Sequence, residues 1–220
     1  RGGRFETWLD IAPNNLVGEV NLFVIDPLIS HSKTKYRISL DSLSGVAHIS
    51  QSDKWWQVNA SDILAVSSNS SVNLPRTYFS TTEKEIVGVF PLIDLAEFSK
   101  AIDGSSYFPE ILNGMALASK PTGVLKNVMI KIKQANLNEW SWSSFAEFEK
   151  LNIESWKGFP AIKNASGIFE ISPKGGSILL NSKEISVFFP KIYSNPLYYD
   201  SIQARFDIEW EDAAVYLNSG

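Results

Sequence analysis

Apolar and polar residues alternate along most of this chain. Between Ala204 and Glu211 every second residue is apolar, and the residues between them are charged. The stretch Lys126–Lys133 alternates in the same way, with apolar side chains at every second position. A period of two over eight residues is typical of an antiparallel strand with one face against apolar surroundings and the other in water.

Further stretches with this alternation are Gly18–Val24, Tyr36–Asp41 and Trp56–Ala60, and short apolar pairs follow around Ile178 and Val187. They are separated by residues that favour turns, at 13–15, 67–71 and 174–176. The pattern therefore predicts a mostly β protein built from consecutive hairpins.

One region has a different period. Apolar residues between Pro91 and Ile102 recur at nearly helical spacing, and the pair Asp103–Gly104 is a suitable helix end. A second candidate helix begins at Pro109, where the fixed φ of proline suits a first helical position, and Pro121 closes it. We expect a short helical hairpin inserted at about residues 91–120.

The sequence also resembles itself at a distance. The segment Leu43–Ser50 resembles Ala165–Ser172 with an offset of 122 residues, which takes Gly45 to Gly167. At an offset of 115 residues, Leu74–Tyr78 resembles Phe189–Tyr193, each with a proline at its second position. Such repeats indicate a sheet extended by similar hairpin units, each ending in a proline-containing bend. The alternative is chance similarity between amphipathic strands.

Composition narrows the function. The 220 residues include 20 basic and 24 acidic ones, giving a net charge of −4, and the two signs are interspersed, so we expect no nucleic-acid partner. Cysteine is absent, which excludes disulfides and thiolate metal sites. No apolar run is long enough for a membrane-spanning helix. The chain begins at Arg1 without an initiator Met, so we expect residues 1–220 to be one segment of a longer protein.

No catalytic constellation is recognisable. His48 alternates with apolar neighbours and should face solvent, and His31 lies in a polar, loop-like stretch. The pair Gly175–Gly176 fits a hairpin turn, because no phosphate-binding Lys and no helix follow it. The acidic residues between Ala204 and Glu211 resemble a solvated strand face. We therefore expect no enzyme activity, no metal and no cofactor.

Seven tryptophans suggest a competing function. Trp55 and Trp56 should point to opposite faces of one strand, whereas Trp140 and Trp142 should share a face, and Trp156 follows in the next stretch. Exposed indole rings are stacking platforms in carbohydrate-binding β-sandwiches, and buried ones fill cores. A carbohydrate- or peptidoglycan-binding β-sandwich is therefore an alternative function.

An ordered series of short motifs resembles a known family. It comprises Ser166–Ile171, Gly175–Leu180, Phe189–Tyr193 and Ile202–Trp210, preceded by Phe108–Leu117 and then Gly123 and a strand. This series resembles the AsmA-like envelope proteins, in particular their YhdP branch. The resemblance implies a long repeating β-groove protein, anchored in the inner membrane of Gram-negative bacteria and reaching across the periplasm. It also implies a role in moving phospholipid to the outer membrane.

The fold expected on this basis is a strongly curved antiparallel β-sheet that forms an elongated groove. Its apolar face would shelter acyl chains, since each methylene costs about 0.8 kcal/mol in water and a chain of ~16 carbons therefore needs roughly 12 kcal/mol of shelter. The expected partners are phospholipid acyl chains, and the inner and outer membranes through other parts of the protein. A structural spacer with a closed core is the third possibility. The residues expected to line the groove are Val20, Leu22, Val24, Ile38, Leu40, Val58, Val128, Ile130, Ile132, Phe206 and Ile208.

Overall fold

The protein is dominated by one long antiparallel sheet. The computed structural model describes residues 2–12, 15–30, 37–52, 55–67, 70–102, 118–136, 139–157, 159–211 and 214–219. The large sheet has 12 strands, and a separate sheet has two, β3 and β4. The strands are β1 (Gly2–Ala12), β2 (Asn15–Ile25), β3 (Leu28–Ser30), β4 (Arg37–Ser39), β5 (Ser42–Ser52), β6 (Trp55–Ser67), β7 (Ser70–Thr81), β8 (Glu85–Asp94), β9 (Thr122–Asn136), β10 (Glu139–Ile153), β11 (Ala161–Ser172), β12 (Gly175–Phe188), β13 (Leu197–Glu211) and β14 (Ala214–Ser219).

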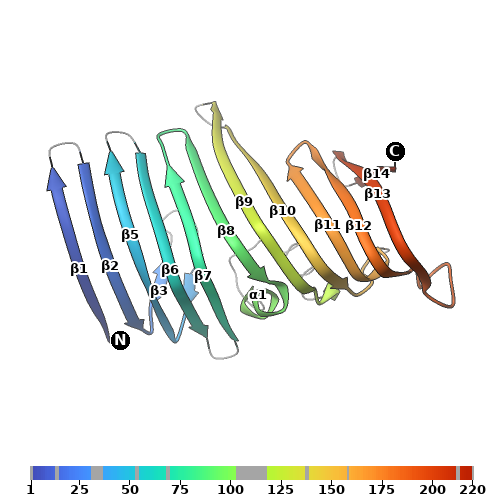
Figure 1. The fold of residues 1–220 in the computed structure, drawn as a ribbon, viewed down its shortest axis with the longest axis horizontal. Coiled ribbons are helices and arrows are strands. Elements are labelled where there is room, and N and C mark those ends of the chain that lie inside the picture. Colours follow the sequence, from blue (N-terminus) through green and yellow to red (C-terminus); the bar gives the residue numbers. More distant parts are fainter. Residues whose placement is uncertain are drawn as a thin grey trace.

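The strands of the large sheet follow one another in chain order from β1 to β14, interrupted only where β3 and β4 leave it. Every neighbouring pair in it is antiparallel, as the predicted hairpins require. Figure 1 shows the result: an elongated array with the two chain ends at opposite ends of the molecule. The prediction of a mostly β, antiparallel protein is confirmed.

The sheet is open, because its order runs from β1 to β14 and the two outer strands do not pair with each other. The described part is also not strongly curled across the strands, so the strong curvature expected from the sequence is not borne out (Figure 1). Curvature of a whole sheet depends on small twists between many neighbouring strands, which the alternation of apolar residues within each strand does not determine.

The two ends of the strands are connected differently. At one end the turns are short, such as the one between Ser172 and Gly175. The other end carries the longer connections, including the one that holds β3 and β4 and the one that holds the helix α1 (Leu95–Ile102). We call the first end the hairpin rim and the second the loop rim.

The helix begins later than the sequence predicts. Residues from Pro91 to Asp94 continue β8, where Leu92 lies opposite Lys126 of β9. Asp94 then caps the helix, because its Oδ1 accepts hydrogen bonds from the backbone N–H of Ala96 at 2.9 Å and of Glu97 at 3.0 Å. The second predicted helix lies mostly outside the described residues, which resume with Ala118 and Ser119 in a helical turn.

The internal repeat is visible in the strand order. Strands β1, β2, β5, β6, β7 and β8 form one run, and β9 to β14 form a second run of the same length. The offset of 122 residues takes Gly45 in β5 to Gly167 in β11, and it takes Asp62 in β6 to Glu184 in β12. Asp62 and Glu184 both have a positive φ, of 54° and 52° respectively. The equivalence at an offset of 115 residues is wrong, because Pro75 lies within β7 whereas Pro190 lies in the turn after β12.

Candidate functional site

The strand registers trace one face across the whole sheet. Residues directly opposite each other in an antiparallel pair have their side chains on the same face of the sheet. The residues on one face can therefore be followed from each strand to the next through the pairs of opposed residues. One such row crosses all the strands of the large sheet and is almost entirely apolar. It runs through Leu9, Gly18, Ile49, Val58, Phe79, Gly88, Ile130, Ser144, Ile171, Gly176, Ile208 and Leu217. We call the face that carries this row the apolar face, and the opposite one the polar face.

Most of the residues predicted to line a groove lie on the apolar face. Val58, Ile130 and Ile208 belong to the row itself, and the alternation along their strands places the others beside them. These others are Val20, Leu22, Val24, Val128, Ile132 and Phe206. The structure does not bring Ile38 and Leu40 there, because Ile38 lies in β4 of the two-stranded sheet and Leu40 follows that strand.

Among the residues that the structure describes, no second layer covers the apolar face over its full length. In the described parts, the large sheet packs through neighbouring strands, and α1 contacts β7, β8 and β9. Large side chains on the face remain accessible: Ile130 is 37% exposed and Ile86 is 40% exposed. An antiparallel sheet of this kind normally buries one face against a core. An apolar surface left open over so many strands indicates a binding surface.

The packing of the apolar face is tighter toward the C-terminal half. Phe148, Ala165 and Ile185 form a buried cluster across β10, β11 and β12, and Ile185 is only 1% exposed. The Phe148 ring stacks against that of Phe169 with centroids 6.5 Å apart. Since the described strands form a single layer here, the neighbouring side chains themselves cover the cluster, and the surface above it is apolar.

Strand irregularities lie close together in this half. Lys150, Asn164 and Glu184 each have a positive φ at a shift of register in β10, β11 and β12. The Asn164 side chain donates to the carbonyl oxygen of Lys183 at 2.9 Å, and its backbone N–H donates to Asn152 Oδ1 at 3.0 Å. Bulges bend the strands that carry them, so these side chains help to shape the apolar face.

The polar face carries ion pairs that join neighbouring strands. Lys126 Nζ lies 2.7 Å from Glu149 Oε1, and Lys133 Nζ lies 3.5 Å from Glu85 Oε1. On β13, Arg205 Nε donates to Asp207 at 3.1 Å, which confirms the solvated face predicted there. His48 is exposed on this face beside Glu19, with 3.5 Å between Nδ1 and Oε2, as its alternation predicts. Exposed pairs of this kind add little stability and keep the face hydrated.

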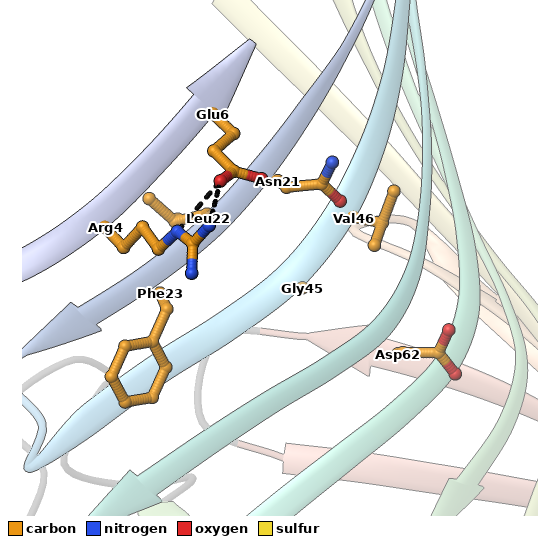
Figure 2. Close-up of a pocket in the computed structure, with 8 residues that line it drawn as sticks. All are labelled: Arg4, Glu6, Asn21, Leu22, Phe23, Gly45, Val46 and Asp62. Carbon is orange, nitrogen blue, oxygen red and sulfur yellow. Dashed lines mark hydrogen bonds and ion pairs between the residues drawn. The ribbon is translucent and has the colours of Figure 1, made fainter.

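A pocket of about 290 Å³ opens among β1, β2, β5 and β6. Figure 2 shows its charged and polar side chains: Arg4 is paired with Glu6 on β1, Asn21 lies on β2 and Asp62 on β6. Its apolar lining comes from Leu22, Phe23, Gly45 and Val46. The guanidinium of Arg4 is already neutralised by Glu6, and the remaining groups form no arrangement for acid–base or nucleophilic chemistry. Within the described residues, no group of His, Cys, Asp and Glu side chains is placed to hold a metal ion.

The tryptophans divide between the two faces. Trp56 and Trp142 lie on the apolar face, because Trp56 is opposite Thr81 and Trp142 is opposite Ile132. Trp8, on the polar face of β1, is 62% exposed. The side chain of Trp140 is outside the described part of the structure. A β-sandwich would need a second sheet packed on the first, and the large sheet is a single layer in the part of the chain described.

Sequence reasoning missed the bulges and the polar side chains at them, notably Ser182. Its hydroxyl accepts from the Ser166 N–H at 2.8 Å and donates to the Ser166 carbonyl at 3.0 Å. The sequence does carry a signal for the bulge: the apolar residues of this strand change from even-numbered to odd-numbered positions. Leu180 and Ile185 lie on the same face although they are an odd number of residues apart, which a regular strand does not allow.

Comparison with known proteins identifies the family. The family model described as YhdP protein matches residues 1–219. No curated protein and no solved structure was found to match the chain. In the described part of the chain, no helix is both long and apolar enough to cross a bilayer. The match covers nearly the whole sequence, so the chain belongs to the YhdP protein family.

Proposed function

We propose that this chain is a lipid-conducting segment of a bridge between the inner and outer membranes, with phospholipid acyl chains lying on its apolar face. The family is one of cell-envelope proteins that are generally not enzymes. In this proposal the segment lies in the periplasm, other parts of the protein anchor it in the inner membrane, and the transport supports the permeability barrier of the outer membrane.

The observation that carries the proposal is the continuity of the apolar face. A single row of opposed residues crosses every strand of the large sheet, and in its middle Gly88, Ile130 and Ser144 are directly opposed. Phospholipid transfer needs such continuity, because complete exposure of an acyl chain of ~16 carbons to water costs roughly 12 kcal/mol, about 0.8 kcal/mol for each methylene. The bulges in β10 to β12 bend the strands that carry them, and in this proposal the bent strands give the acyl chains a shallow apolar surface to lie on.

The structure offers less support to the two other functions. A spacer with a closed core would bury its large apolar residues, yet Phe79, Ile86 and Ile130 on the apolar face are between 37% and 40% exposed. A carbohydrate-binding sandwich would have two packed sheets, and the described strands outside β3 and β4 belong to one sheet.

The test uses two adjacent residues of β9 that point to opposite faces, Ile130 and Met129. A photo-crosslinking amino acid at Ile130 is expected to capture phospholipid in cells, detected by mass spectrometry, and the same group at Met129 is not. Ile130→Asp is expected to reduce captured and co-purified lipid while the melting temperature stays close to that of Met129→Asp, because the partly exposed carboxylate keeps its water. Failure to find phospholipid at Ile130, or unfolding of the Ile130→Asp variant alone, would contradict the proposal.

A further inference from the structure

The apolar face differs between its two rims. Toward the hairpin rim, one row of opposed residues runs from β1 to β10 through Ile11, Leu16, Gln51, Trp56, Thr81, Ile86, Ile132 and Trp142. We call it the rim row. It mixes apolar side chains with amide, hydroxyl and indole groups that can form hydrogen bonds.

The corresponding rows near the loop rim contain no polar side chain. In the first half the row runs through Gly3, Val24, Leu43, Ala65 and Val72. In the second half it runs through Ile153, Ile162, Val187 and Leu197. The apolar face is therefore amphipathic along the strand direction, with hydrogen-bonding groups gathered toward the hairpin rim.

The two tryptophans of the rim row are the most informative residues. Trp56 is 41% exposed and Trp142 is 42% exposed, so both rings are partly covered and partly accessible. An indole ring combines a large apolar surface with a single N–H donor, and for this reason tryptophan gathers where hydrocarbon meets polar headgroups. These two rings lie in one row although they come from β6 and β10, which are far apart in the sequence.

We infer that a diacyl phospholipid on the apolar face is oriented, with its ester and headgroup region at the rim row and its acyl chains directed toward the loop rim. This inference rests on the proposed function and adds Trp56 and Trp142 as residues that position the lipid. In this orientation the indole N–H groups donate to ester or phosphate oxygens, and the rings cover the first methylenes.

The dimensions agree with this orientation. From the rim row at Trp56 to the loop-rim row at Ala65 the strand advances nine residues, about 30 Å at ~3.3 Å per residue. One leaflet of acyl chains occupies about 15 Å, half of the ~30 Å hydrocarbon core of a bilayer. Acyl chains that begin at the rim row therefore end within the apolar part of the face.

The experiment measures how spin-labelled phosphatidylcholine quenches tryptophan fluorescence of this chain. One lipid carries the doxyl group near the ester and the other near the methyl end of the acyl chain. The near-ester label is expected to quench several-fold more strongly. That difference is expected to disappear in the double variant Trp56→Phe, Trp142→Phe and to persist in the control Trp8→Phe, which changes an exposed ring on the polar face.

The outcomes separate this inference from the proposed function. If Ile130 crosslinks phospholipid but the two labels quench equally, or the label near the methyl end quenches more, the orientation is wrong and the function stands. A difference that survives in the double variant would also overturn the assignment of Trp56 and Trp142. If neither label quenches and Ile130 captures no lipid, the proposed function and this inference fail together.

Discussion

At the scale of single residues, the apolar face contains one polar side chain that is essential to its shape. Ser182 is 2% exposed and replaces part of the regular ladder by bonding both the N–H and the carbonyl of Ser166. The register between β11 and β12 is interrupted at this point, between the pairs Lys163–Ser186 and Gly167–Leu180. A buried serine on the apolar face is tolerated because its hydroxyl both donates and accepts a hydrogen bond.

Ser182→Ala is therefore expected to lower the free energy of unfolding by about 1–3 kcal/mol, because it leaves the Ser166 N–H without its partner. The midpoint of urea unfolding measures this loss. The control is Ser201→Ala, which removes an exposed hydroxyl on β13 and should change stability by less than about 0.5 kcal/mol. Equal losses in the two variants would contradict the structural role given to Ser182.

At the scale of elements, alternation predicted the strands and their two faces well, and it failed where the backbone departs from regularity. Strands such as β9 and β13 appear where the sequence places them, with Val128 and Ile208 buried on the apolar face. A prediction that assumes strict alternation misses bulges, because a bulge adds one residue to the strand and turns every later side chain to the opposite face. It also extended the helix back to Pro91, since helical spacing of apolar residues says nothing of the pairing between Leu92 and Lys126 that keeps this segment in β8.

The bulge in β12 depends on a left-handed residue, Glu184, with φ 52°. Glu184→Val is expected to lower the free energy of unfolding by about 1–2 kcal/mol, because a branched Cβ is strongly disfavoured in this conformation. Glu184→Gly should not be destabilising, since glycine adopts positive φ without this strain. Lys183→Val, at the exposed residue just before it, is the matched control and should leave unfolding by urea almost unchanged.

At the scale of the whole molecule, local patterns determine which residues share a face, and they determine the overall curvature much less. The repeat at an offset of 122 residues predicted the similarity of β5–β6 and β11–β12, and the structure extends it to two runs of strands joined through β8 and β9. The strong curvature did not follow, because it depends on small twists and bends accumulated over many strands. The departure of β3 and β4 from the large sheet likewise has no signal in the alternation of Tyr36–Asp41.

An open sheet has two outer strands, and β1 is one of them. All its residues are exposed, and one edge of its backbone lies unpaired in the structure. Unpaired strand edges pair readily with other strands, so the 220-residue chain is expected to associate end to end. Sedimentation velocity at increasing concentration should show this association.

Two proline variants of β1 test whether the edge is responsible. The N–H of Asp26 donates a hydrogen bond to the carbonyl oxygen of Asp41, which lies just before the first residue of β5. Hydrogen-bonded pairs alternate along an antiparallel ladder, so the even-numbered residues of β2, including Val20, form the hydrogen-bonded pairs with β5. Thr7 lies opposite Val20, so its N–H points away from β2 toward the free edge, whereas that of Glu6 points into the sheet. Thr7→Pro should therefore suppress association with little loss of stability, and Glu6→Pro should destabilise β1 because it removes a ladder hydrogen bond. Association that persists in Thr7→Pro at the wild-type level would mean that the molecules meet through their apolar faces instead.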